Sequence, residues 1–393
     1  MNKILEEQVR SYTKHADFRS ALGIPQNAEF SIEKLAQGEC NVNFCFLHPV
    51  SEKKLVLRVN LVSQMHLADQ IGYEFTALCA LSGCGRTPKP LYLDRHAADA
   101  DGDPIGNGLM VYEYLPGCPL DYRTDLGRAA KLLADIHSYP YRRGQTVSMK
   151  HTIPETKFET AAEIRLKIPA VNAEKQEYWG ENSGRAEHRN TELPALIPTD
   201  DPLGMILDEC EAMVQTYYAS PLAVPETVSR IRRMLKKGHE LAEGSTQKKD
   251  GYRCIINTEL NSGNFLMNNK GTDYLIDWEK PLYGAPAQDL GHFLAPTTTF
   301  WKTDVILTDA EIETFTEQYI RAVRGRFDTA GLQEELRLFL PITCLRGITW
   351  CAMAWVQYQD PASGAPKNLD TWKKLCAYLS DAFLGEIERR YFS

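Results

Sequence analysis

Residues 254–279 read CIINTELNSGNFLMNNKGTDYLIDWE, and this stretch is the most informative part of the chain. Two short apolar runs, 265–267 and 274–276, stand on either side of a polar segment that contains Asn-Asn-Lys-Gly at 268–271. A polar segment of this length ending in glycine is typical of the turn between two antiparallel strands. The stretch therefore predicts a β-hairpin with its open end at the two flanking residues.

The residues that flank this hairpin are Asn264 and Asp277. Because the start of one strand lies beside the end of the other, we expect the two side chains to lie close together. An amide oxygen and a carboxylate at one point suit a hard cation such as Mg²⁺. Glu259, on the loop leading in, precedes Asn264 by the spacing that separates the catalytic Asp from the metal-binding Asn in protein kinases.

The chain resembles the aminoglycoside phosphotransferase and choline kinase superfamily, small-molecule relatives of protein kinases. The catalytic segment of that superfamily usually reads H-x-D-x-x-x-x-N, then I-D-W-E or similar, then a D-L-A-type element. The corresponding segments here are 257–264 (NTELNSGN), 276–279 (IDWE) and 289–291 (DLG). Earlier matches, in order, are a glycine loop at 38–41, the strand Leu57-Arg58-Val59, the helix residue Glu74, a hinge at 110–117 and an L-A-x-L-H-like helix at 133–137.

The resemblance covers residues 30–295 or so and implies an α+β, protein-kinase-like bilobal fold. An antiparallel-sheet N-lobe would occupy 1–115, and a mostly helical C-lobe would occupy 116–393 with an insertion at about 141–201. The residue patterns agree with this division, since β-rich runs come first and helical spacing follows. The expected strands are 30–36, 42–47, 54–60, 90–94 and 108–115. The expected helices include 63–81, 126–137, 202–218, 226–243 and a buried, nearly all-apolar helix at 340–358.

One ion pair follows from the periodicity of the N-lobe. Glu74 lies in or beside the apolar stripe of the helix expected at 63–81. Arg58 shares a strand face with Val56, opposite the face of the neighbouring leucines. Because a buried carboxylate needs a partner, we expect Arg58 to pair with Glu74. The alternative is a Glu74 side chain at the edge of the stripe, in solvent.

The resemblance also implies roles for the matched residues. Those assigned to the nucleotide are Gly38 and Asn41 in the glycine loop, Arg58 with its partner Glu74, and backbone groups of Glu113, Tyr114 and Leu115 for the adenine. Those assigned to catalysis and Mg²⁺ are Glu259 as acceptor of a hydroxyl proton, Asn264 and Asp277 as metal ligands, and Glu279 as an assisting ligand. Asp289 is expected to brace the catalytic loop rather than contact substrate.

Two positions depart from the pattern of the superfamily. Glu259 stands where the family has Asp, and Asn257 stands where it has a His that supports the loop. The extra methylene of Glu shifts the carboxylate by roughly 1 Å, and a misplacement of about 1 Å can cost around 10²-fold in rate. The sequence leaves open a working kinase with a shifted substrate, a slow kinase, and a pseudokinase that binds nucleotide or metabolite. Transfer of AMP instead of a phosphoryl group is a further alternative.

Composition narrows the classes of partner. The net charge is −8, which argues against nucleic acid as a partner. No apolar stretch suggests a membrane span, and the polar first twenty residues suggest no signal peptide. Ten cysteines without a C-x-x-C pair fit a reducing compartment, so we expect a cytoplasmic protein. The prediction is a phosphotransferase that uses ATP or GTP with Mg²⁺ on a hydroxyl of a small molecule, such as an amino sugar or amino alcohol. The acceptor and the oligomeric state stay open.

Overall fold

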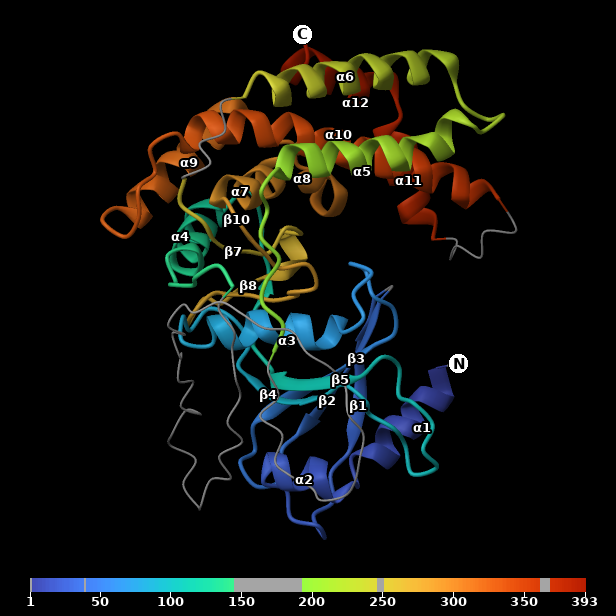
Figure 1. Cartoon of the computed structure of the whole chain (residues 1–393), viewed down its shortest axis with the longest axis vertical. Helices are drawn as coiled ribbons and strands as arrows, with labels where there is room; N and C mark the ends of the chain where they lie inside the picture. The colour runs from blue at the N-terminus through green and yellow to red at the C-terminus, as the bar shows by residue number, and fades with distance from the viewer. Residues whose placement is uncertain (1, 39, 145–192, 246–250, 361–367) are drawn as a thin grey trace, which may run out of the picture. The chain divides into compact units, whose positions relative to one another are not determined.

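The computed structural model describes the chain except residues 1, 39, 145–192, 246–250 and 361–367. It divides into two compact units, one made of Met1–Leu115 with Tyr141–Leu196 and the other of Pro116–Pro140 with Ile197–Ser393 (Figure 1). Most of the insertion predicted at about 141–201 lies outside the described residues.

The first unit is built on a five-stranded antiparallel sheet in the order β1-β2-β3-β5-β4. Its strands are β1 (Ile32–Gln37), β2 (Asn41–Leu47), β3 (Lys54–Asn60), β4 (Pro90–Asp94) and β5 (Leu109–Glu113). Its helices are α1 (Asn2–Tyr12), α2 (Ala16–Leu22) and α3 (Gln70–Leu81). All five predicted strands are therefore present.

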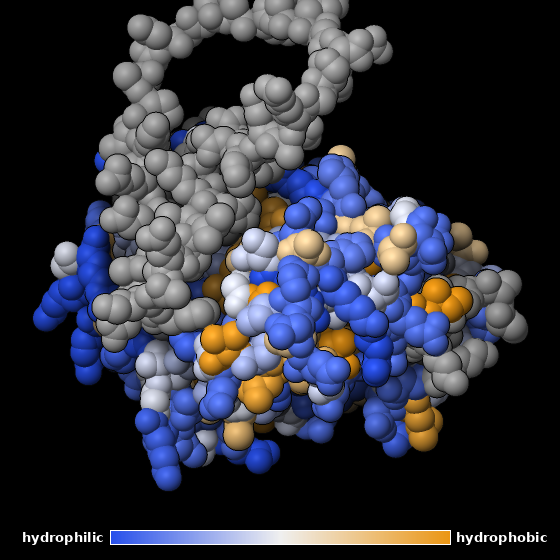
Figure 2. Space-filling view, turned by 90° about the horizontal axis from the view of Figure 1, so that it is seen from below, coloured by the Kyte–Doolittle hydropathy of each residue, from blue (hydrophilic) through white to orange (hydrophobic). Residues whose placement is uncertain are grey.

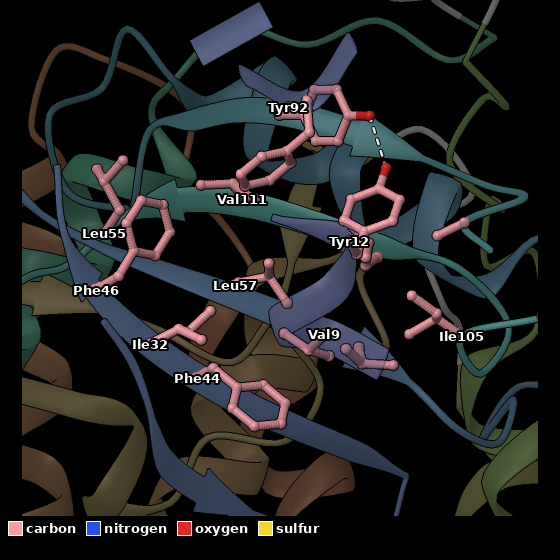
Figure 3. Close-up of a cluster of buried hydrophobic side chains, with 14 of the residues drawn as sticks. Val9, Tyr12, Ile32, Phe44, Phe46, Leu55, Leu57, Tyr92, Ile105 and Val111 are labelled. Atoms are coloured by element: carbon pink, nitrogen blue, oxygen red, sulfur yellow. Dashed lines mark hydrogen bonds between the residues drawn. The ribbon is translucent and has the colours of Figure 1, made fainter. Parts of the chain in front are cut away.

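The two faces of β3 have different partners, as its alternating sequence predicts. Leu55 and Leu57 join the buried core beneath α1 and α2, where the Tyr12 hydroxyl lies 2.7 Å from that of Tyr92 (Figure 3). Arg58 points to the other face and reaches α3. Because side chains alternate along a strand, one residue sets the core while the next is available for the site.

Helix α3 begins seven residues later than the sequence predicted. The Asp69 carboxylate accepts the backbone N–H of Gly72 at 2.9 Å and caps the helix there. Gly72 permits this cap, since a Cβ at that position would lie 2.2 Å from the Asp69 carboxylate. The prediction began the helix at residue 63 because apolar spacing does not show where a capping side chain starts a helix.

The second unit is mostly helical. Its helices are α4 (Leu126–His137), α5 (Pro202–Tyr218), α6 (Pro225–Glu243), α7 (Pro286–Leu294), α8 (Pro296–Thr303), α9 (Asp309–Val323), α10 (Leu332–Gln359), α11 (Leu369–Tyr378) and α12 (Asp381–Tyr391). Helices α4, α5 and α6 match their predicted ranges to within a residue. Helix α10 packs against α5 and α7 in the interior of the unit.

Helix α10 differs from the expectation that no apolar stretch of the chain would suggest a membrane span. It is long and apolar enough to cross a membrane, with a mean hydropathy of 1.4 over an 18-residue window. However, 67% of that window is buried inside the unit. Helix α10 is therefore the buried core helix that the sequence predicted at 340–358, and its length and apolarity follow from that position.

Two small sheets carry the segment that decided the sequence interpretation. Strand β7 (Cys254–Ile256) pairs with β10 (Leu282–Gly284), and β8 (Phe265–Met267) lies between β6 (Cys118–Pro119) and β9 (Tyr274–Leu275). Strands β8 and β9 form the predicted hairpin, with Phe265 opposite Leu275. A 3₁₀ turn, η1 (Ser262–Asn264), leads into β8.

The surface shown in Figure 2 is largely hydrophilic. Its apolar side chains, among the described residues visible there, stand in small separate groups. Scattered apolar side chains of this kind are normal on a folded protein, so this face suggests no docking surface.

Candidate active site

The loop after β7 is held by one buried carboxylate. Asp289, on α7, accepts the backbone N–H of Asn257 at 2.8 Å and that of Thr258 at 2.7 Å. Thr258 has a φ of +67°, a conformation that costs free energy for a residue other than glycine. The two hydrogen bonds hold this strained turn in place. They confirm that Asp289 braces the loop.

Asp289 is itself fixed by two residues from distant helices. His137, at the end of α4, places Nε2 3.2 Å from the Asp289 carboxylate and Nδ1 2.8 Å from the hydroxyl of Tyr319 on α9. All three side chains are fully buried. His137 is therefore part of the support of the loop.

Asn257 ties the loop to the metal-binding segment. Its Nδ2 donates to the backbone carbonyl of Asp277 at 2.9 Å, and its Oδ1 accepts the N–H of Glu259 at 3.1 Å. The residue that replaces the superfamily's His thus supports the loop on both sides. The departure at this position leaves the loop anchored.

Asn264 and Asp277 lie at the open end of the hairpin, as predicted. The N–H of Ile276 donates to the Asn264 carbonyl at 2.9 Å, which makes the two segments direct neighbours. The Asn264 amide nitrogen donates to the Glu259 carbonyl at 2.9 Å, which leaves the side-chain oxygen as the atom that could bind a metal. Asp277 is exposed and adopts a φ of +64°, a strained conformation typical of functional sites.

These donors fit a divalent cation that is shared with phosphates. An amide oxygen and a carboxylate are hard ligands, as Mg²⁺ prefers, and Mg²⁺ usually takes its other ligands from water and substrate. In the described part of the chain, no group of three or more His, Cys, Asp or Glu side chains forms a complete cage. Glu279 is half-buried two residues beyond Asp277, while Trp278 between them is buried and its indole N–H donates to Leu275.

Glu259 is not a solvated loop charge. Its Oε1 lies 3.1 Å from Nζ of Lys280 and 3.9 Å from Nη2 of Arg346, a residue of α10. Arg346 is also held by Glu209 of α5, at 2.7 Å and 3.2 Å. Glu259, the predicted proton acceptor, thus lies near two cations, one from a loop and one from α10.

Electrostatics near Glu259 keep a histidine neutral. Burial, followed by the positive charge of Arg346, lowers the pKa of His292, on α7, to about 4. His292 Nδ1 lies 3.2 Å from the carbonyl of Leu260, so this nitrogen carries the proton and donates it. Burial alone would lower the pKa of Arg346, but the hydrogen bonds and charge of Glu209 raise it.

The predicted nucleotide residues all lie in the first unit. The Arg58–Glu74 pair is confirmed, with Arg58 Nε donating to Glu74 Oε2 at 3.0 Å while Gln70 donates to the other oxygen at 3.2 Å. Both side chains are at most 5% exposed. A buried pair with a further hydrogen bond holds the guanidinium in a fixed place.

The glycine loop and the hinge are ordered by backbone contacts. Gly38 N–H donates to the Asn41 carbonyl at 2.9 Å, and the Asn41 side chain is buried, where its oxygen accepts from Asn60 at 3.0 Å. Asn41 therefore holds the loop rather than presenting its side chain to solvent. At the hinge, the N–H groups of Glu113 and Tyr114 already donate to backbone carbonyls.

The hydrogen bonds that the hinge N–H groups already make reduce the number of backbone groups that could contact adenine. The Glu113 N–H bonds to Lys89 and the Tyr114 N–H bonds to Lys54, each at about 3 Å. The Lys54 ammonium also lies 4.2 Å from the centre of the Tyr114 ring. The backbone groups expected to meet an adenine are therefore the carbonyls of these two residues and the backbone of Leu115.

Comparison with known proteins shows the family of the chain. The sequence model of the phosphotransferase enzyme family matches residues 31–334. The chain belongs to this family. No curated protein sequence matches the chain.

Solved structures show the same kinase-like fold for this phosphotransferase. One is spectinomycin phosphotransferase APH(9)-Ia in complex with ADP and spectinomycin, with 12% identity, a TM-score of 0.54 and 92% of each chain covered. Another is choline kinase from Cryptosporidium parvum Iowa II, with 10% identity, a TM-score of 0.55, and 99% of this chain and 96% of that chain covered. A third is amicoumacin kinase hAmiN in complex with AMP-PNP, Ca²⁺ and Ami, with 14% identity, a TM-score of 0.51, and 90% and 88% covered.

Sequence reasoning missed the charged neighbours of Glu259 in this phosphotransferase. Lys280 directly follows the I-D-W-E motif, so its position was visible but its partner was not. Arg346 and Glu209 are 137 residues apart, and only the packing of α10 on α5 brings them together. His292 lies three residues beyond Asp289, almost one helical turn, and this spacing was the available signal.

Proposed function

We propose that this phosphotransferase moves the γ-phosphoryl group of ATP to a hydroxyl of a small molecule with the help of Mg²⁺. The observation that carries the proposal is the cross-linked arrangement of Glu259, Asn264 and Asp277. It provides a proton acceptor and two hard metal ligands on two segments joined by hydrogen bonds. The small-molecule kinases among the solved structures, with spectinomycin or amicoumacin bound, support the choice of acceptor class.

Each ligand has proposed contacts in the chain. A bound Mg²⁺ would supply positive charge to offset the charge that develops on the phosphoryl group during transfer. Asn264 and Asp277 hold the metal, with Glu279 assisting. Arg58 contacts the α and β phosphates. Gly38 has no side chain, so its backbone can approach the phosphates through the space that a Cβ would take, where the nearest atom lies at 3.9 Å.

The transfer itself requires little covalent chemistry from the protein. The acceptor oxygen forms a bond to the γ-phosphorus as the bond between that phosphorus and the bridging oxygen breaks, and ADP leaves. The hydroxyl proton passes to the carboxylate of Glu259. Catalysis of this kind depends on positioning and on charge neutralisation, so the loop that carries Glu259 must be held in place.

Nucleotide binding gives the first test. ATP or GTP at a concentration 100 times its Kd, with Mg²⁺, should stabilise the folded state by about 2.7 kcal/mol and raise its melting temperature. Asp277→Asn should reduce the shift seen with Mg²⁺ and leave any shift seen with nucleotide and EDTA. No shift with either nucleotide would contradict the proposal.

Product mass gives the second test. The protein is incubated with ATP, Mg²⁺ and a panel of amino sugars, amino alcohols, neutral sugars and hydroxy acids. An added phosphoryl group supports the proposal, whereas an added nucleotidyl group indicates transfer of AMP. Nucleotide binding without turnover of any acceptor would indicate the pseudokinase instead. The cytoplasmic location stays a prediction.

A further inference from the structure

Lys280 is placed to set the position of Glu259. Its ammonium lies 3.1 Å from Oε1 of Glu259, and the two side chains are 18% and 28% exposed. Both residues stand at the same end of the β7–β10 pair, in which Ile256 lies opposite Leu282. The pair therefore spans the catalytic loop and the segment that follows the metal-binding Asp277.

The backbone of Lys280 is anchored to the same loop. The Thr258 hydroxyl donates to the Lys280 carbonyl at 2.8 Å. Thr258 directly precedes Glu259, the residue that the Lys280 side chain contacts. Thr258 is in turn fixed by Asp289. Because the backbone is held at this point, the reach of the lysine side chain determines where the carboxylate of Glu259 rests. An exposed lysine on a mobile loop would lack this property.

Arg346 supplies a second cation on the same oxygen. Its guanidinium is fixed by two contacts to Glu209 and lies 3.9 Å from Oε1 of Glu259. Helices α7 and α10 approach closely at residue 291, which is glycine, because a Cβ there would lie 2.5 Å from that of Phe339. The carboxylate thus lies between two cations held by different elements.

We infer that Lys280 is a positioning residue that fixes the carboxylate of Glu259 for proton acceptance. The inference rests on the proposed phosphotransferase function. A glutamate has one more rotatable bond than the aspartate usual at this position, and therefore more conformations to restrict. The ion pair with Lys280 restricts them and compensates for the longer side chain. Glu259 and Lys280 then act as one unit, suited to each other in length.

This arrangement predicts coupling between the two residues. Lys280→Met should lower kcat roughly 10- to 100-fold, the range expected when a catalytic group is misplaced by about 1 Å. The KM for ATP should change by less than about 2-fold, because binding of the nucleotide is not altered. Lys280→Arg, which keeps the charge, should restore part of the loss. Glu259→Asp should also lose activity, since its carboxylate no longer reaches Lys280.

The decisive measurement is a double-mutant cycle in kcat with Lys280→Met, Glu259→Asp and the double variant. Turnover is followed with ATP and the acceptor that the product-mass test identifies, or with water as the acceptor. The double variant should be no slower than the slower single variant. Additive losses, or a Lys280→Met effect confined to the KM for ATP, would show that Lys280 acts on phosphate and would overturn the inference.

A parallel cycle in melting temperature needs no activity. Lys280→Met and Glu259→Gln should each lower the melting temperature by about 2 °C, with the double variant close to the singles. Lys236→Met is the matched control, because that lysine is 80% exposed and pairs with Glu240 at 3.9 Å. It should change neither kcat nor melting temperature. A wild-type protein without turnover overturns the proposed function and with it the inference that rests on that function. Normal turnover in Lys280→Met overturns the positioning role alone.

Discussion

Two ion pairs show how differently this phosphotransferase holds its charged residues. Arg58 and Glu74 lie on a strand and a helix of the first unit, and their side chains are at most 5% exposed. Glu259 and Lys280 lie on two loops of the second unit, with 28% and 18% exposure. The buried pair is fixed by regular elements, and the half-exposed pair is fixed by backbone hydrogen bonds beneath it. Loss of a partner should therefore affect stability in the first case and turnover in the second.

The buried pair should give the largest effect. Glu74→Ala leaves the Arg58 guanidinium buried without its carboxylate, which typically costs about 3–5 kcal/mol in the free energy of unfolding. The measurement is urea denaturation of the whole chain. Replacing both residues, as in Arg58→Met with Glu74→Leu, should restore much of the stability because no unpaired charge remains.

A surface glutamate provides the control for this comparison. Glu240 makes an exposed pair with Lys237 at 2.9 Å, so Glu240→Ala should leave the denaturation curve unchanged. If Glu74→Ala were equally silent, Arg58 would have to reach solvent or another partner. The fixed placement assigned to its guanidinium would then be wrong.

The brace beneath the loop pair should give the next largest effect. Asp289→Asn replaces one oxygen that accepts a loop N–H with an NH₂ group, which opposes the N–H of Asn257 or Thr258. We expect kcat to fall by around 10²-fold, which is about 2.7 kcal/mol in the activation free energy. The KM for ATP and the melting temperature are measured beside it, to separate misplacement from unfolding.

Asp273 allows a matched control on the same hairpin. Its carboxylate accepts the N–H of Asn268 at 2.8 Å, but at the turn end, away from Asn264 and Asp277. Asp273→Asn should therefore keep kcat within about twofold, since the catalytic end of the hairpin is not displaced. Equal losses in Asp273→Asn and Asp289→Asn would mean that the whole hairpin, and not the brace, sets the rate.

The same contrast explains what the sequence could predict. The alternation along β3 and the stripe of α3 assigned Arg58 and Glu74 to facing surfaces, because regular elements repeat their geometry. The turn at 268–271 likewise brought Asn264 beside Asp277. These predictions needed only local rules. The predicted start of α3 is wrong because a capping carboxylate, and not the apolar period, sets where that helix begins.

The surroundings of Glu259 needed the tertiary structure. Arg346 and Glu209 meet there through the packing of α10 on α5, and neither helix has a motif that specifies the contact. The sequence showed Asn257 only as a departure from the His of the family, and the structure shows that its two hydrogen bonds support the loop. Side-chain partners across loops depend on the positions of several elements at once, which no single periodicity encodes.

The smallest of the expected effects concerns His292 and the pH dependence of stability. Burial and the charge of Arg346 lower its pKa from 6.5 to about 4, so the folded state binds fewer protons than the unfolded state between these values. Stability contributed by the neutral ring is present above pH 6.5 and is lost as the pH falls toward 4. Linkage gives a loss of about 2 kcal/mol in the free energy of unfolding between pH 7 and pH 5.

His292→Asn should flatten this dependence, because an amide can still donate to the Leu260 carbonyl but does not titrate. Urea denaturation of both proteins at pH 7 and pH 5 measures the difference. His239, which pairs with Glu211 on the surface and is 43% exposed, is the matched histidine, and His239→Asn should keep the wild-type slope. If His292→Asn kept that slope as well, other groups would carry the acid sensitivity. The surroundings of His292, and of the Glu259–Lys280 pair near it, would then be more solvated than the lowered pKa of His292 indicates.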